Sequence, residues 1–136
     1  HGCTLVLDLG AQPLSISGHL LENPLDLQDP ANLDLAKSLS KMDGALHIGA
    51  DVKLHRFACL LDGRSVPGED RSRGARYNSA LRFSAEHHQA IIVVVSSDRP
   101  VSVVHGGVEL AATFPRSPSF TVGGMPPTLS DWISLG

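Results

Sequence analysis

The first segment whose residue types could do chemistry is Asp43-Gly44-Ala45, placed between an expected helix and an expected strand. Glycine lets a ligand approach the backbone closely, and an aspartate can hold a divalent cation or accept a hydroxyl proton. A motif this short is more often an ordinary turn in front of a strand. On its own it therefore leaves a catalytic role and a structural role open.

A second segment, Arg73-Gly74-Ala75-Arg76-Tyr77-Asn78-Ser79, places arginines at the expected start of a helix. The free N–H groups and the dipole of a helix N-terminus attract anions. Arg73 and Arg76 would add charge and forked donors for phosphate oxygens. The plainer alternative is a solvated basic helix start that pairs with Glu69 and Asp70.

A third segment, Val95-Ser96-Ser97-Asp98, ends the β-branched run Ala90–Val95, which predicts a strand buried on both faces. Ligands of open α/β sheets lie beyond the carboxyl ends of strands, where hydroxyls can bind a phosphate or a base edge. Serine and aspartate are also ordinary residues where a strand turns, so this segment too has a structural alternative.

The elements that must position these segments follow from periodicity and breakers. Asp29-Pro30 predicts a helix start, and Leu35, Leu39 and Met42 give it one buried stripe. The second helix begins after Gly74 and ends around His88, with a stripe of Tyr77, Leu81 and Ala85. Strands are predicted over 3–9, 14–20 (paired with the first), 45–48, 54–61, 90–95, 101–104 and 108–111. This order predicts an α/β (α+β) fold: one domain with a mixed central sheet flanked by helices.

Composition narrows the class of protein. A chain of 136 residues with 42% apolar and 18% charged residues fits one folded domain rather than a disordered polymer. The net charge of −3 gives no broad cationic face, so no direct nucleic-acid partner is expected. The longest apolar run is far shorter than the roughly 20 residues of a membrane span. Cys3 and Cys59 look like small buried hydrophobes, which favours a reducing, cytoplasmic location.

Taken in order, the segments resemble the diadenylate cyclase (DAC) domain of the DNA-integrity-scanning protein (the DisA N-terminal type) and its relatives. The likeness covers roughly residues 1–110. His1-Gly2-Cys3-Thr4-Leu5-Val6 is similar to the first strand of the family, and Lys41-Met42-Asp43-Gly44-Ala45 contains its Asp-Gly-Ala motif. Gly74-Ala75-Arg76-Tyr77-Asn78 occupies the place of its Gly-Thr-Arg-His-Arg motif, and 90–96 followed by Val101-Ser102-Val103 is similar to its next strand pair.

The resemblance implies an adenine-nucleotide site in a DAC-like fold. In the family, two ATP-loaded domains face one another, and each 3′-hydroxyl attacks the α-phosphate of its partner's ATP, with Mg²⁺ or Mn²⁺, to give cyclic di-AMP. Asp43 would then hold metal and help to activate the hydroxyl, while Arg76 would hold phosphate. The other nucleotide-binding positions implied are Gly44 and Ala45 along the nucleotide, Leu61 near the base, Ser96 near the α-phosphate, and Gly74, Ala75, Tyr77 and Asn78.

The residues that depart from the family pattern are expected to bind phosphate less tightly. Ala75 replaces a threonine, and Tyr77 and Asn78 replace a histidine and an arginine. Ser97 stands where a metal-binding glutamate is expected, so a second carboxylate is missing unless Asp98 supplies it. Charge stabilisation is the main means of catalysing nucleotidyl transfer, so such losses slow transfer, whereas base and backbone contacts survive. We therefore expect a degenerate domain that senses ATP or a cyclic dinucleotide and signals to a fused or partner effector module.

Two other functions stay open. The first is an active cyclase, working as a homo-oligomer with facing sites, in which Arg71, Arg73 or Arg82 replaces the missing charge. The second is a structural or oligomerising domain. In each case we expect a DAC-like domain over residues 1–112, followed by a Pro/Gly-rich C-terminal extension over 113–136.

Overall fold

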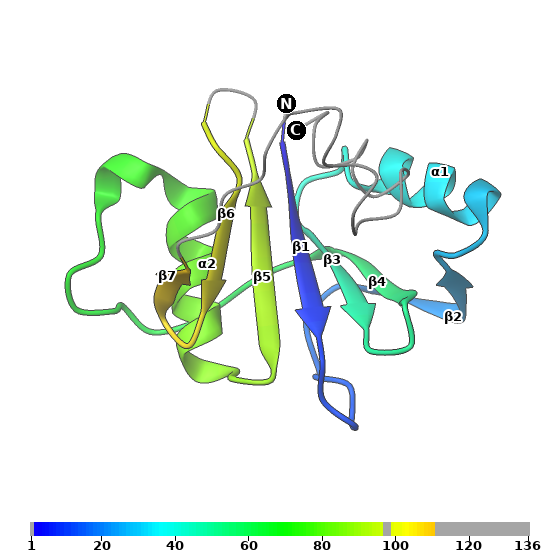
Figure 1. The fold of residues 1–136 in the computed structure, drawn as a ribbon, viewed down its shortest axis with the longest axis horizontal. Helices are drawn as coiled ribbons and strands as arrows, with labels where there is room; N and C mark the ends of the chain where they lie inside the picture. The colour runs from blue at the N-terminus through cyan, green and yellow to red at the C-terminus, as the bar shows by residue number, and fades with distance from the viewer. Residues whose placement is uncertain (1, 97–98, 111–136) are drawn as a thin grey trace, which may run out of the picture.

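The computed structural model describes residues 2–96 and 99–110 and shows a single mixed sheet with two α-helices (Figure 1). Seven strands of the described chain form the sheet in the order β2-β4-β3-β1-β5-β6-β7. This arrangement confirms the predicted fold class. The elements are β1 (Cys3–Asp8), β2 (His19–Asp26), α1 (Pro30–Leu39), β3 (Ala45–Gly49), β4 (Lys53–Cys59), the short 3₁₀ helix η1 (Arg71–Arg73), α2 (Ala75–Glu86), β5 (Ala90–Val95), β6 (Ser102–His105) and β7 (Val108–Leu110).

Strand β1 lies in the middle of the sheet, where both of its faces are covered. It pairs in parallel with β3, with Thr4 opposite Ala45, and antiparallel with β5, with Thr4 opposite Val94. Successive side chains of a strand point to opposite faces. The buried run Cys3–Val6 therefore serves two cores, one on each side of the sheet.

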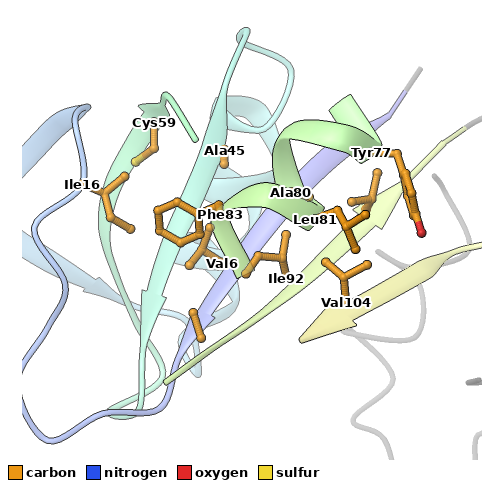
Figure 2. Close-up of a cluster of buried hydrophobic side chains, with 12 residues drawn as sticks. Val6, Ile16, Ala45, Cys59, Tyr77, Ala80, Leu81, Phe83, Ile92 and Val104 are labelled. Carbon is orange, nitrogen blue, oxygen red and sulfur yellow. The ribbon is translucent and has the colours of Figure 1, made fainter. Parts of the chain in front are cut away.

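The two helices cover opposite faces of the sheet. Val6 packs with Leu81 and Phe83 of α2, in the cluster drawn in Figure 2. Leu5 packs in a second cluster with Leu33 of α1. Helix α2 contacts β5, β6 and β7, whereas α1 contacts β2 and β4 (Figure 1). Neither helix combines the length and apolarity that crossing a bilayer requires.

The second strand differs from its prediction. Residues 14–20 were expected to form a strand beside the first, but β2 spans His19–Asp26 and pairs with β4 at the edge of the sheet. A register shift between Leu20 and Leu25 accommodates Asn23-Pro24, and an edge strand tolerates proline because its outer N–H groups need no partner. The segment before β2 instead packs Ile16 into the α2-side core.

Helix α1 begins as predicted but ends earlier and uses another face. The Asp29 carboxylate accepts a hydrogen bond from the Ala31 amide at 3.0 Å, which confirms the predicted cap. The helix ends at Leu39 rather than near Met42. Its buried residues are Leu33 and Ala36, whereas Leu35 and Met42 of the predicted stripe are 48% and 47% exposed. The stripe prediction holds for Leu39, which packs against the α1-side cluster. It is wrong for Leu35 and Met42, because α1 contacts the sheet through the face that carries Leu33 and Ala36.

The other predicted elements are present, and their ends within the described residues agree to within two positions. In α2, Tyr77 and Leu81 are buried as the stripe requires, and the helix ends at Glu86. The buried strand β5 spans Ala90–Val95 as predicted, and both cysteines are buried. The expected extension over 113–136 lies outside the described residues.

Candidate functional site

A cavity of about 380 Å³ lies on the α2 side of the sheet, between the first turn of α2, the start of β3 and the end of β4. It brings Asp43 and Arg76 together, from segments more than thirty positions apart in the chain. The described residues that line it are Thr4, Asp43, Gly44, Ala45, Cys59, Leu60, Leu61, Ala75, Arg76 and Ser79. Six of the ten residues proposed from the sequence therefore surround one hollow.

Asp43 is held at the cavity by the glycine that follows it. Gly44 has φ +110°, in the left-handed region that favours glycine. A Cβ atom on Gly44 would lie 2.6 Å from the carbonyl carbon of Ala58, so only glycine allows this close approach to β4. Ala58 itself has φ +52°, where the β3–β4 register shifts between Ala45 and His47. The irregular backbone beside the cavity is the kind of strain that collects at functional sites.

The first turn of α2 supplies the other wall. Gly74 caps the helix with φ +90° and no side-chain hydrogen bond, and the next two residues, Ala75 and Arg76, line the cavity. The Arg76 guanidinium runs beside the start of β1. A Cβ atom on Gly2 would lie 2.5 Å from Arg76 Nη1 and 2.1 Å from the Val95 carbonyl oxygen. The glycine at position 2 thus leaves the space that this arginine occupies.

Tyr77 and Asn78 do not line the cavity. The Tyr77 hydroxyl donates a hydrogen bond to Glu109 Oε2 at 3.2 Å, and the Asn78 side-chain amide donates to the Asp70 carbonyl oxygen at 2.9 Å. Figure 2 shows Tyr77 on the far side of α2 from Ala45 and Cys59, which both line the cavity. These two motif positions fasten the helix to β7 and to the loop before it.

Ser96 and Gly74 also lie outside the lining. Ser96 follows β5 and is half-buried, and Gly74 precedes the helix. The neighbouring Ser97 and Asp98, considered as the third motif and as a second carboxylate, lie outside the described residues.

Arg73 is engaged away from the cavity. Its Nη1 atom lies 3.1 Å from Glu109 Oε2, and its guanidinium stacks 3.9 Å from the centre of the Tyr77 ring. The hydrogen bond from Arg73 lowers the pKa of Glu109. A larger hollow of about 610 Å³ beside this pair is lined by Arg73, Arg99, Pro100, Val101, Ser102, Glu109 and Leu110. It contains neither Asp43 nor Arg76, so we take the smaller cavity as the candidate site.

Arg82 is likewise committed to another partner. Its guanidinium donates to both carboxylate oxygens of Glu69, and the bond from Nε to Oε2 is 3.0 Å long. The hydrogen bonds from Arg82 and from the Val66 amide lower the pKa of Glu69 to about 2. Neither Arg73 nor Arg82 lines the cavity, so Arg76 is the one cationic side chain among the described residues that line it.

The side chains that line the cavity could hold a divalent ion only if a bound ligand supplied further oxygen atoms. No group of three or more His, Cys, Asp or Glu side chains within 2–96 and 99–110 is placed to hold a metal. Asp43 is the one carboxylate among the described lining residues. Mg²⁺ is commonly bound by one or two carboxylates together with substrate phosphates and waters. Asp43 fits that mode, in which phosphate oxygens complete the coordination.

Sequence reasoning missed four lining residues: Thr4, Cys59, Leu60 and Ser79. The sequence could have indicated two of them. Ser79 lies one helical turn beyond Ala75, and Thr4 belongs to the first strand motif, two residues after Gly2. Cys59 is opposite Ala45 in the β3–β4 pairing, which the sequence does not reveal. Burial raises the pKa of the Cys59 thiol to about 11, so the thiol is neutral at physiological pH.

Comparison with known structures agrees with this fold. A crystal structure of a hypothetical membrane spanning protein from Bacillus cereus is 20% identical with a TM-score of 0.64, and the match covers 84% of this chain and 56% of that one. A double cysteine mutant of DacA from Staphylococcus aureus is 19% identical with a TM-score of 0.56, covering 80% and 73%. The chain thus spans little more than half of the Bacillus cereus protein. No curated protein matches it.

The family comparison covers most of the chain and includes every described residue that lines the cavity. Residues 1–108 match the family model described as DAC, the DisA bacterial checkpoint controller nucleotide-binding domain. The predicted resemblance is confirmed, and this chain belongs to the DAC family of DisA-type nucleotide-binding domains.

Proposed function

We propose that the cavity binds an adenine nucleotide, and that the domain senses ATP or a cyclic dinucleotide rather than synthesising one. One observation carries the proposal: Asp43 and Arg76, from two separate motifs, line the same hollow with Gly44, Ala45, Leu61 and Ala75. A cation and a carboxylate at the mouth of a partly apolar cavity suit a ligand with a charged tail and a flat uncharged ring.

Five of the residues that line the cavity have a proposed role. Arg76 holds phosphate through its forked donors, and Leu61 packs on the base. The backbone at Gly44 and Ala45 follows the nucleotide. Asp43 accepts a ribose hydroxyl or, with phosphate oxygens, holds Mg²⁺ or Mn²⁺, which when bound would neutralise phosphate charge.

Three other motif positions, Gly74, Tyr77 and Asn78, act indirectly in this proposal. Gly74 starts the helix, while Tyr77 and Asn78 fix its position through Glu109 and Asp70. Ser96 stands at the end of β5, where we propose that it contacts phosphate only when a ligand is bound.

Sensing is favoured over synthesis by the distribution of positive charge. Transfer of a nucleotidyl group requires that developing charge on phosphate be stabilised. Of the three arginines considered as replacements for the lost motif charge, Arg73 and Arg82 are paired with Glu109 and Glu69, and Arg71 is not among the residues that line the cavity. One arginine can bind a phosphate, but it supplies less positive charge for a transition state than the two arginines of the family motif.

The second candidate is an active diadenylate cyclase, which the presence of Asp43 in the cavity favours. Two copies would face one another, each with ATP and Mg²⁺ or Mn²⁺, and condense two ATP into cyclic di-AMP. In either case we propose a cytoplasmic domain over 1–112, followed by a Pro/Gly-rich extension over 113–136. A sensor would signal to a fused or partner effector module.

Incubation of the purified protein with ATP and Mn²⁺ separates the two functions. The sensor proposal expects binding of ATP or cyclic di-AMP by calorimetry and no accumulation of product. Cyclic di-AMP that forms with the wild type and vanishes with Asp43→Asn would establish the cyclase instead. Silence in calorimetry with ATP, ADP and cyclic di-AMP would favour a structural or oligomerising domain.

A further inference from the structure

The side of the sheet that carries α1 is covered by a helix at one end. Helix α1 contacts β2 and β4, whereas β6 and β7 lie at the opposite end of the sheet (Figure 1). Helix α2 covers β6 from the other side, where Val104 packs with Leu81. Among the described residues, no helix therefore packs over the α1 side of β6 and β7.

Apolar side chains continue across this side as far as the edge of the sheet. Four residues in register on neighbouring strands form one row: Leu5, Val93, Val103 and Leu110. Residues paired across strands point to the same face. Leu5 and Val93 are buried in the α1-side cluster, but Leu110 is 42% exposed, and Val108, two residues before it, is 60% exposed. Val103, Val108 and Leu110 are called the β7 face below.

The row ends beside the larger hollow of about 610 Å³. Leu110 and Val101 give this hollow an apolar wall. Two arginines also line it, and only one of them has an ionic partner among the described residues. Arg73 pairs with Glu109 at 3.1 Å, whereas Arg99 donates to a backbone carbonyl oxygen. An apolar segment that carries an acidic side chain would suit this surface.

The chain itself contains a segment of that composition. The described part ends at Leu110, which lines the hollow, and residues 111–136 follow it. Near the end of the sequence, Leu129, Trp132 and Ile133 have the i, i+3, i+4 spacing of one apolar helix face. Asp131 is the one acidic residue in 111–136. The intervening residues 111–128 can span up to about 60 Å, many times the spacing of about 5 Å between neighbouring strands.

We propose that the segment 129–135 packs against the β7 face, with Trp132 in the hollow beside Leu110 and Asp131 next to Arg99. Removal of the large indole ring from water favours this contact. A tethered segment is also present at a high effective concentration, so it binds more readily than a separate partner of the same composition. The contact would cover an edge strand that could otherwise pair with another chain.

Fluorescence of the full chain tests the proposal, because Trp132 is its one tryptophan. In the wild type, emission should lie at a shorter wavelength than that of free tryptophan, and acrylamide should quench it less. Leu110→Ser and Val108→Ser should each weaken docking roughly ten- to a hundredfold, the contribution of one buried apolar side chain. Both variants should therefore move emission and quenching toward the values of free tryptophan. Leu20→Ser, at an exposed position of the opposite edge strand β2, is the matched control and should change neither.

Each contrary outcome overturns the proposal. A wild-type Trp132 as accessible as free tryptophan would show that nothing is docked. Shielding that both variants leave unchanged would place the ring elsewhere. Docking within one chain is independent of protein concentration, so shielding that is lost on dilution would assign the face to a second copy. If circular dichroism shows that Leu110→Ser does not fold, Val108→Ser decides alone, because that side chain is the more exposed. The test needs no nucleotide, so its result is independent of the proposed function.

Discussion

The Tyr77 hydroxyl donates a hydrogen bond to Glu109 Oε2 at 3.2 Å, so this position of the helix motif faces β7 and not the cavity. Arg76, the preceding residue, faces the cavity. One residue of an α-helix turns the side chain by about 100°, and that rotation separates a binding position from a structural one. Asp43 and Arg76 remain the pair around which the proposed site is built.

Replacement of Tyr77 by phenylalanine should lower stability and leave nucleotide binding unchanged. The variant keeps the buried ring but loses a hydrogen bond to a half-exposed carboxylate, so we expect a loss of about 1 kcal/mol in the free energy of unfolding. Urea unfolding and calorimetric titration with ATP check the two halves. A fall in affinity at unchanged stability would mean that Tyr77 contacts the ligand.

Replacement of Gly44 by alanine should be much more damaging than the same change at Gly68. Both glycines have positive φ, +110° and +80°, so both substitutions strain the backbone. Only at Gly44 would the new Cβ meet backbone, 2.6 Å from the Ala58 carbonyl carbon, whereas nothing lies within 4 Å at Gly68. We expect about 1 kcal/mol of destabilisation at Gly68 from strain alone and clearly more at Gly44. Equal urea midpoints for the two variants would contradict the close approach.

The α1 and β2 predictions show what can be read from the sequence and what cannot. The Asp29-Pro30 cap is local, and the structure contains it. The face of α1 that packs depends on the sheet beneath it, so Leu33 is buried and Leu35 is exposed. The position of β2 at His19–Asp26 depends on a register shift that accommodates Pro24. No local sequence pattern predicts that shift.

The site was predictable in part for the same reason. Asp43 and Gly44 form a local motif, and the sequence identifies them. Tyr77 was predicted both for the buried stripe and for the site. In the structure it is buried and does not line the cavity, because Arg76 is the residue of this turn that faces the cavity. Thr4 and Ser79 are single hydroxyl residues that gain a common place only when β1 and α2 pack together.

Replacement of Arg76 by alanine should weaken the binding of ATP more than the binding of AMP. The guanidinium is the one cation among the described lining residues, so its contribution grows with the charge of the phosphate tail. We expect a loss of about 1.5–3 kcal/mol for ATP, roughly ten- to a hundredfold in Kd. Arg71→Ala, just ahead of α2 and outside the cavity lining, serves as the control. Equal losses for AMP and ATP would remove Arg76 from the phosphate position.

Replacement of Asp8 by asparagine should destabilise the protein at neutral pH and less so in acid. Burial opposes ionisation of Asp8, but hydrogen bonds from Gln89, the Leu14 amide, His47 and the Gly10 amide outweigh it and lower its pKa below the ordinary 3.8. A lowered pKa in the folded state gives stability that is full above the unfolded value and is lost as the pH falls through the folded value.

The difference in unfolding free energy between wild type and Asp8→Asn should therefore be on the order of 3 kcal/mol at pH 7 and should shrink steadily below about pH 4. Urea unfolding at several pH values measures it, with Asp34→Asn on the exposed face of α1 as the control. A difference that stays constant from pH 7 to pH 3 would show that the charge of Asp8 does not stabilise the fold.

The central claim is that one ligand occupies one cavity between Asp43 and Arg76. Amide chemical shifts recorded by NMR during titration with ATP test it most directly. We predict that the amides of Gly44, Ala45, Ala75 and Arg76 shift together and saturate at a single ATP concentration. Shifts confined to the hollow around Arg73 and Arg99, or shifts at only one of the two motifs, would contradict the account.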